Sequence, residues 1–136
     1  MLAQDIGQVL AELPPLRDCF IVLVKPDAGV STKEAFEAFD TAESIRHPDC
    51  NAMIHAAANS DFDGITKNVG NVFEQFIEVP QRAEIKATMR NHGSLACCMS
   101  GSGPTVFGIF DTKEKAEKCA AAIPTKLGKA FVTKPI

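Results

Sequence analysis

The 136-residue chain contains no Trp and no Tyr, so every aromatic contact it makes depends on nine Phe residues and three His residues. It also lacks a surplus of positive charge, because 14 Lys and Arg stand against 17 Asp and Glu for a formal net charge of −3. Proteins that bind nucleic acids or anionic membranes through phosphates usually carry a basic surface. The composition therefore supports neither a nucleic-acid partner nor a membrane partner.

Long apolar runs are absent as well, since none approaches the ~18 residues that a membrane span requires. The opening MLAQDIGQVLAEL lacks the basic stretch and following apolar stretch of a secretory signal. No C-x-x-C pair and no H-E-x-x-H pattern occurs. These absences predict a cytoplasmic protein with no metal site and with five reduced thiols, at Cys19, Cys50, Cys97, Cys98 and Cys119.

Hydrophobic periodicity and capping residues predict four strands and five helices. The strands are expected over residues 19–25, in LACCM, in TVFGIF and in KAFVTK, and the helices after a capping box at 31–34, over 51–59, over 65–79, from Pro80 to Gly93 and from Asp111 to Ile123. This order is that of an α+β ferredoxin-like split β-α-β fold with extra helices in the first crossover. We expect a four-stranded antiparallel sheet with helices mainly on one face.

Five small residues, SGSGP, separate two of the predicted strands, within the segment ACCMSGSGPTVFGIF. A nucleophile elbow around Ser102 would need Gly at positions 100 and 104, where the chain has Ser100 and Pro104. A P-loop would need Gly at 106 and Lys at 107, and a dinucleotide fingerprint would need a helix directly after the glycines. The segment is therefore a strand–loop–strand unit of another kind.

Two interpretations of this loop remain open on residue chemistry alone. Gly101 and Gly103 can adopt positive φ and admit a ligand close to the backbone. Successive N–H groups, with the hydroxyls of Ser100, Ser102 and Thr105, would then form an anion-binding nest. The alternative is a hairpin turn that binds nothing, although hairpins more often use two-residue turns.

Four stretches resemble the GHMP kinase superfamily, and the likeness covers essentially the whole chain. MSGSGPTVFGIF resembles the third signature motif of that superfamily. LPPL with FIVLVKPDAGVSTKEAF resembles the start of the C-terminal domain of the kinases that act on 4-diphosphocytidyl-2-C-methyl-D-erythritol. GNVFE and MRNHGSLACCMSGSGPTVF are similar to a helix motif and to the lead-in to the loop in the same kinases.

The resemblance implies that residues 1–16 are a residual interdomain linker and residues 17–136 the C-terminal, substrate-side domain of an ATP-dependent kinase. That kinase would phosphorylate the 2-hydroxyl of 4-diphosphocytidyl-2-C-methyl-D-erythritol in the non-mevalonate isoprenoid pathway. In the family the ATP loop, a Lys and the Asp base belong to the N-terminal domain, and the present sequence contains no such motifs. We therefore expect the full-length enzyme to use ATP and Mg²⁺, and this chain alone to be inactive and to bind neither stably.

Site residues follow from the same resemblance. The phosphate-side loop would be formed by Ser100, Gly101, Ser102, Gly103 and Thr105, and the corner beside the nucleotide-diphosphate substrate by Val30, Ser31 and Thr32. Asn71 and Glu74 would support the loop, and no catalytic or metal-binding residue is expected. The alternatives are simple helix capping for the corner and an exposed helix face for Asn71 and Glu74.

Other functions also remain open at this point. The chain is also compatible with the C-terminal domain of another GHMP kinase, such as homoserine kinase. A function of a different class is also open, namely that of a standalone ferredoxin-like module that binds a metabolite, or regulates, without catalysis. In the kinase interpretation the surface that meets the N-terminal domain would be exposed in this chain, which favours self-association.

Overall fold

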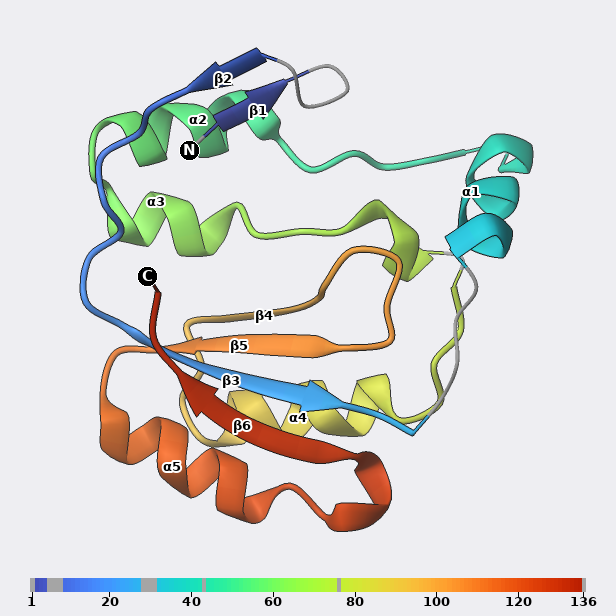
Figure 1. Ribbon diagram of the computed structural model, residues 1–136, viewed down its shortest axis with the longest axis vertical. Coiled ribbons are helices and arrows are strands. Elements are labelled where there is room, and N and C mark those ends of the chain that lie inside the picture. Colours follow the sequence, from blue (N-terminus) through green and yellow to red (C-terminus); the bar gives the residue numbers. More distant parts are fainter. Residues whose placement is uncertain (1, 5–8, 28–31, 43, 76, 136) are drawn as a thin grey trace.

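The computed structural model describes residues 2–4, 9–27, 32–42, 44–75 and 77–135. Near the N-terminus, β1 (Leu2–Gln4) and β2 (Val9–Ala11) form a short antiparallel hairpin that hydrophobic periodicity did not predict. Among the described residues, no helix is both long enough and apolar enough to cross a membrane. The remaining elements build one sheet and the helices around it (Figure 1).

The sheet has four antiparallel strands in the spatial order β4 (Ala96–Met99), β5 (Val106–Phe110), β3 (Phe20–Lys25) and β6 (Lys129–Thr133). In chain order these are the second, third, first and fourth strands of the sheet, which is the ferredoxin-like arrangement predicted from the sequence. The register pairs Val24 with Val106 and Met99 with Val106. Because of this register, the β4–β5 loop lies at the same end of the sheet as the end of β3.

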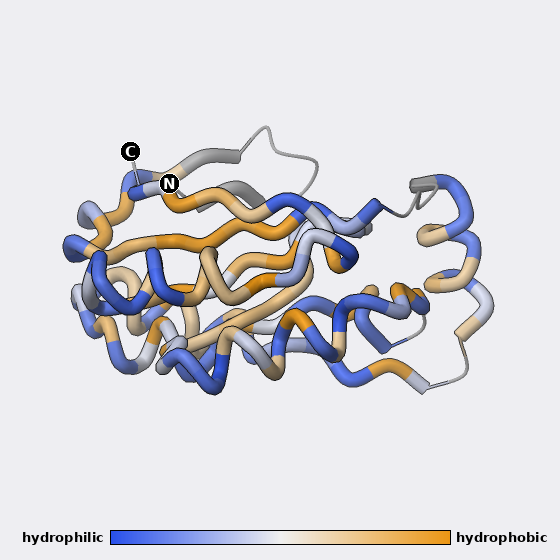
Figure 2. Tube along the Cα trace, turned by 90° about the horizontal axis from the view of Figure 1, so that it is seen from below, coloured by the Kyte–Doolittle hydropathy of each residue, from blue (hydrophilic) through white to orange (hydrophobic). Residues whose placement is uncertain are grey.

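One face of the sheet is covered by α4 (Arg82–Asn91) and α5 (Lys113–Ala122) (Figure 1). Figure 2 shows the hydrophobic stretches gathered in the strands and the hydrophilic ones along the outer sides of the helices. The main core lies between these layers and contains Val22, Val24, Ile85, Met89, Val106, Phe110, Ala116 and Cys119. The predicted α+β class, with helices mainly on one face, is confirmed.

The opposite face is only partly covered. A smaller cluster joins Phe62 of α3 (Phe62–Lys67) to Ile109 and Cys19. Farther along this face, Leu23 lies directly between Phe107 and Phe131 on the neighbouring strands, and Phe131 is 54% exposed. Phe107 packs against the smaller cluster, so the apolar side chain that stays most exposed on this part of the face is Phe131 of β6.

The crossover from β3 to β4 contains α1 (Thr32–Thr41), α2 (Cys50–Ala58), α3, the 3₁₀ helix η1 (Val72–Gln75) and α4. The extra helices were predicted, but the continuous helix over 65–79 was wrong. The DFDG segment begins α3, because the Asp61 carboxylate accepts the Gly64 N–H at 3.1 Å. Asn68 caps the end of that helix, and the chain then turns before η1. A second 3₁₀ helix, η2 (Thr125–Leu127), precedes β6.

Candidate phosphate-binding site

The predicted strand–loop–strand unit is present: residues 100–105 connect β4 to β5. Within it the Ser100 N–H donates to the Thr105 carbonyl at 2.8 Å, and the Gly103 N–H donates to the Ser100 carbonyl at 3.0 Å. Gly101 and Gly103 have φ of +55° and +90°, and the Gly103–Pro104 peptide is cis. The loop is therefore wider than a two-residue hairpin turn and depends on backbone angles that glycine adopts most readily.

The two glycines serve different purposes in the loop. A Cβ on Gly103 would lie 2.7 Å from the Met99 sulfur, so this position requires the absence of a side chain for packing. A Cβ on Gly101 would meet no atom within 4 Å, and Gly101 is exposed. The space above Gly101 is open to a ligand, whereas that beside Gly103 is already filled.

Backbone donors remain available on this loop. Its internal hydrogen bonds use the N–H groups of Ser100 and Gly103, and Pro104 has none. Among the described residues, no acceptor is assigned to the N–H groups of Gly101 and Thr105. Unclaimed N–H groups on a glycine loop are suited to a phosphate oxygen.

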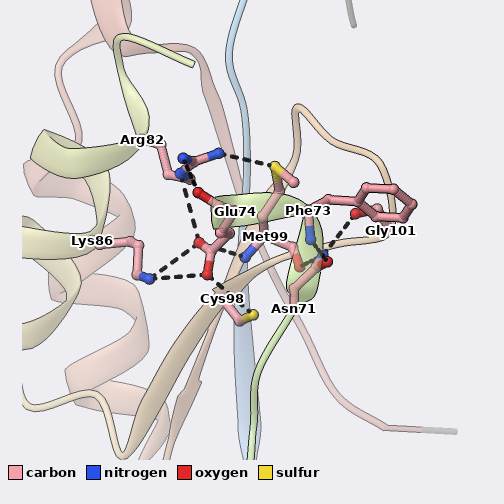
Figure 3. Close-up of polar contacts among 8 residues, drawn as sticks. All are labelled: Asn71, Phe73, Glu74, Arg82, Lys86, Cys98, Met99 and Gly101. Carbon is pink, nitrogen blue, oxygen red and sulfur yellow. Dashed lines mark hydrogen bonds and ion pairs between the residues drawn. The ribbon is translucent and has the colours of Figure 1, made fainter. Parts of the chain in front are cut away.

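Asn71, directly before η1, holds the loop from the side. Its amide nitrogen donates to the Met99 carbonyl at 2.7 Å and to the Gly101 carbonyl at 2.6 Å (Figure 3). Its side-chain oxygen accepts the Phe73 N–H at 3.0 Å, which begins the 3₁₀ turn. One side chain therefore fixes both the start of η1 and the backbone at the start of the glycine loop.

Glu74, on η1, anchors the end of β4 through a second set of contacts. Its Oε1 atom accepts the Met99 N–H at 3.2 Å and lies 3.1 Å from Lys86 Nζ and 3.7 Å from Arg82 Nε. The side chain is only 18% exposed, so it is not on an open helix face. Glu74, Arg82 and Lys86 form the cluster that we call the Glu74 cluster (Figure 3).

A thiol completes the surroundings of this carboxylate. Cys98 Sγ lies 3.6 Å from Glu74 Oε2. Burial first, and then the negative charge of Glu74, raise the pKa of the Cys98 thiol from 9.0 to about 11. The thiol is therefore neutral at pH 7 and adds no charge to the cluster.

Comparison with known proteins identifies the family. The family model described as GHMP kinases C terminal matches residues 53–130, which include η1, α4 and the glycine loop. The chain belongs to the GHMP kinase family, in its C-terminal domain. It is 35% identical, over 98% of its length, to 4-diphosphocytidyl-2-C-methyl-D-erythritol kinase of Clostridium tetani (strain Massachusetts / E88), of which it covers 48%. The chain thus spans about half the length of this relative.

Solved structures support the same fold. A homoserine kinase from Cytophaga hutchinsonii matches 93% of this GHMP kinase domain with a TM-score of 0.70 and 20% identity, covering 44% of that protein. The structure of a 4-(cytidine 5'-diphospho)-2C-methyl-D-erythritol kinase matches 97% with a TM-score of 0.65 and 24% identity, covering 48%. At these identities the structural likeness shows the fold alone.

The predicted substrate corner is only partly described in this GHMP kinase domain. Val30 and Ser31 lie outside the described residues, and Thr32 is the first residue of α1. The α1 helix stands at the end of the molecule where the glycine loop lies (Figure 1), and the Phe36 ring contacts the Phe73 ring of η1 with centroids 5.3 Å apart. Contacts from η1 therefore extend to both predicted segments, the corner helix and the glycine loop.

GHMP kinases use ATP and Mg²⁺, so the residues of this domain can be tested against both. No group of three or more His, Cys, Asp or Glu side chains in the described part of the chain could hold a metal ion. The glycine loop, by contrast, fits a phosphate group, because it has open space and unclaimed N–H donors. A recess of about 400 Å³ lies elsewhere, between residues 13–17 and helices α2 and α3, away from the loop (Figure 1).

Sequence reasoning missed Arg82 and Lys86. Both are on α4, four residues apart, and their side chains are 14% and 19% exposed. The signal was present, because a basic pair at i and i+4 beside the buried Ile85 and Met89 places charge next to the core. A charged pair that a helix turns inward needs a buried partner, and Glu74 provides it.

Proposed function

We propose that this chain is the substrate-side C-terminal domain of an ATP-dependent kinase that phosphorylates the 2-hydroxyl of 4-diphosphocytidyl-2-C-methyl-D-erythritol, a step of the non-mevalonate isoprenoid pathway. In this proposal residues 1–16 are interdomain linker and residues 17–136 the domain. The whole kinase is proposed to be cytoplasmic. Its other half binds most of the ATP and supplies the catalytic base.

The observation that carries the proposal is 35% identity across 98% of the chain to a kinase of that name. The geometry of the glycine loop supports it independently, because unclaimed N–H groups beside open space suit a phosphate. The named kinase is twice as long as the present chain, so its activity is attributed here to the full-length protein only.

Phosphoryl transfer depends mainly on positioning and on neutralising the charge of the moving group. ATP, when bound, supplies that phosphoryl group. In this proposal the glycine loop contributes hydrogen-bond donors along one side of the phosphates: the N–H groups of Gly101 and Thr105 and the hydroxyls of Ser100, Ser102 and Thr105. Gly103 allows the loop to fold back on Met99. The corner at Val30, Ser31 and Thr32 is proposed to lie beside the cytidine diphosphate portion of the substrate.

The proposal is tested with the full-length protein, purified and incubated with Mg²⁺, ATP and 4-diphosphocytidyl-2-C-methyl-D-erythritol. We expect ADP and a product with a new phosphomonoester signal in ³¹P NMR. Homoserine, tested in parallel, addresses homoserine kinase, another GHMP kinase of similar fold. Phosphorylation of homoserine alone would replace the substrate in the proposal, and absence of phosphorylation of either compound would favour a non-catalytic binding module.

A further inference from the structure

The Glu74 cluster contains two cations and one carboxylate, and all three are largely buried. The exposed fractions of the Glu74, Arg82 and Lys86 side chains are 18%, 14% and 19%. Among the described residues, neither Arg82 nor Lys86 has a second carboxylate within ion-pair distance. The cluster therefore carries one positive charge more than it balances.

An unbalanced charge in such a position is costly to a protein. The desolvation free energy of a buried cation is offset only when an anion or several good acceptors replace the lost water. A single carboxylate shared by two cations offsets this desolvation only in part, because its Oε1 atom also accepts the Met99 N–H. An additional anion nearby would reduce this cost.

The hydrogen bonds of Arg82 show where such an anion would be favoured. Its Nη2 atom donates to the Glu74 carbonyl at 3.1 Å, whereas its Nη1 atom has, within the described part of the chain, the thioether sulfur of Met99 as its single acceptor, at 3.3 Å. A thioether is a weak acceptor. The same sulfur is packed against Gly103 of the glycine loop. The Nη1 side of the Arg82 guanidinium, which has the poorer acceptor, is therefore separated from the loop by one side chain, that of Met99 (Figure 3).

We propose that Arg82 and Lys86 provide the positive charge that attracts a phosphate or diphosphate group to the glycine loop. The loop itself contains no cationic residue, so its backbone donors act on an anion that the cluster behind them attracts. Glu74 and Asn71 are positioning residues in this arrangement, since they fix Met99 and Gly101. This inference rests on the proposed function, because it takes the loop to be the phosphate site.

Lys86→Met is the sharpest perturbation, since it removes the surplus charge and leaves the Glu74–Arg82 pair in place. A unit charge about 10 Å from an anion, at an effective dielectric of about 20, changes its affinity by roughly tenfold. Lys118→Met is the matched control, because it removes the same charge from an exposed ion pair with Glu114 on α5. Lys86→Arg keeps the charge, and Lys86→Gln is a second neutral variant should the Met variant fold poorly.

The experiment measures the dissociation constants of inorganic diphosphate and of ATP by calorimetry, using the full-length protein at low and high salt. We expect Lys86→Met to weaken both by roughly tenfold at low salt and less at high salt, with Lys86→Arg and Lys118→Met close to wild type. Thermal unfolding midpoints check that each variant is folded.

The outcomes separate this inference from the proposed function. If Lys86→Met binds both ligands like Lys118→Met while the kinase assay shows the expected product, the charge inference is wrong and the function stands. If the wild-type protein phosphorylates neither substrate but binds diphosphate in a Lys86-dependent way, the inference stands and the function is wrong. If the wild-type protein binds no diphosphate or ATP, both are overturned.

Discussion

Substituting Ala for each of the two loop glycines should separate packing from ligand binding. Both have positive φ, which costs an L-residue about 1–2 kcal/mol. At Gly101 the added methyl meets nothing, so Gly101→Ala should destabilise by this backbone cost alone, about 1–2 kcal/mol. At Gly103 it would lie 2.7 Å from the Met99 sulfur, and Met99 is 1% exposed and hydrogen-bonded by Arg82. Overpacking there adds about 1–3 kcal/mol to the backbone cost, for a total of about 2–5 kcal/mol.

Urea unfolding followed by circular dichroism measures the free energy of unfolding of both variants. Affinity for ATP in the full-length protein provides the second readout. If a phosphate occupies the open space at Gly101, the Gly101→Ala variant should lose about tenfold or more in affinity while losing less stability than Gly103→Ala. Equal destabilisation by the two substitutions would contradict the packing argument, and unchanged ATP affinity in Gly101→Ala would contradict a ligand over that residue.

Phe110 is fully buried in the main core, so Phe110→Ala should lower the free energy of unfolding, measured in urea, by about 3–5 kcal/mol. An equally small loss for Phe110→Ala and for the exposed Phe131→Ala would refute this assignment of the core. Burial raises the pKa of the Cys98 and Cys119 thiols from 9.0 to about 11, with the Glu74 carboxylate adding to the effect at Cys98 and the Cys97 thiol at Cys119. Above pH 9 the unfolded state releases these two protons while the folded state keeps them. The free energy of unfolding should therefore fall between pH 9 and pH 11, by about 2–3 kcal/mol per thiol. Cys119→Ala should reduce this pH dependence, and an unchanged slope would contradict the shift at Cys119. The purified 136-residue chain should self-associate through the face bearing Leu23, Phe107 and Phe131, and Phe131→Ser should shift it toward monomer, so a monomeric wild-type mass in sedimentation would rule this out. The same chain should transfer no phosphoryl group from ATP to 4-diphosphocytidyl-2-C-methyl-D-erythritol, and formation of ADP with that substrate would refute the expectation.

The sheet could be predicted from the sequence because its strands are short apolar runs bounded by strong signals. Pro26 follows β3, and the SGSGP segment separates β4 from β5. At these positions the local preference of the residues matches the tertiary structure. The same holds for Gly93, which lies just after the end of α4 and has a φ of +84°. The order of elements then left few topologies for a four-stranded antiparallel sheet.

The helix over 65–79 failed for the opposite reason, since apolar spacing there competes with side-chain hydrogen bonds. Val69, Val72 and Phe73 have helical spacing, but Asn71 uses its side chain to bind Phe73 and the glycine loop. Asn commonly forms such local bonds in place of helical ones. The decisive contacts join residues about 30 positions apart, and a local pattern contains no information about them.

The site shows the same division between local and distant information. The loop is visible in the sequence because its small residues are consecutive, and Asn71 and Glu74 were identified only through resemblance to a family. Arg82 and Lys86 were missed because a basic pair on a helix usually faces solvent. Their importance becomes apparent only when η1 brings Glu74 against α4 and β4 at once. A 3₁₀ turn of four residues therefore links the two parts of the candidate site, and substitutions at Asn71 or Glu74 should affect the glycine loop although neither residue belongs to it.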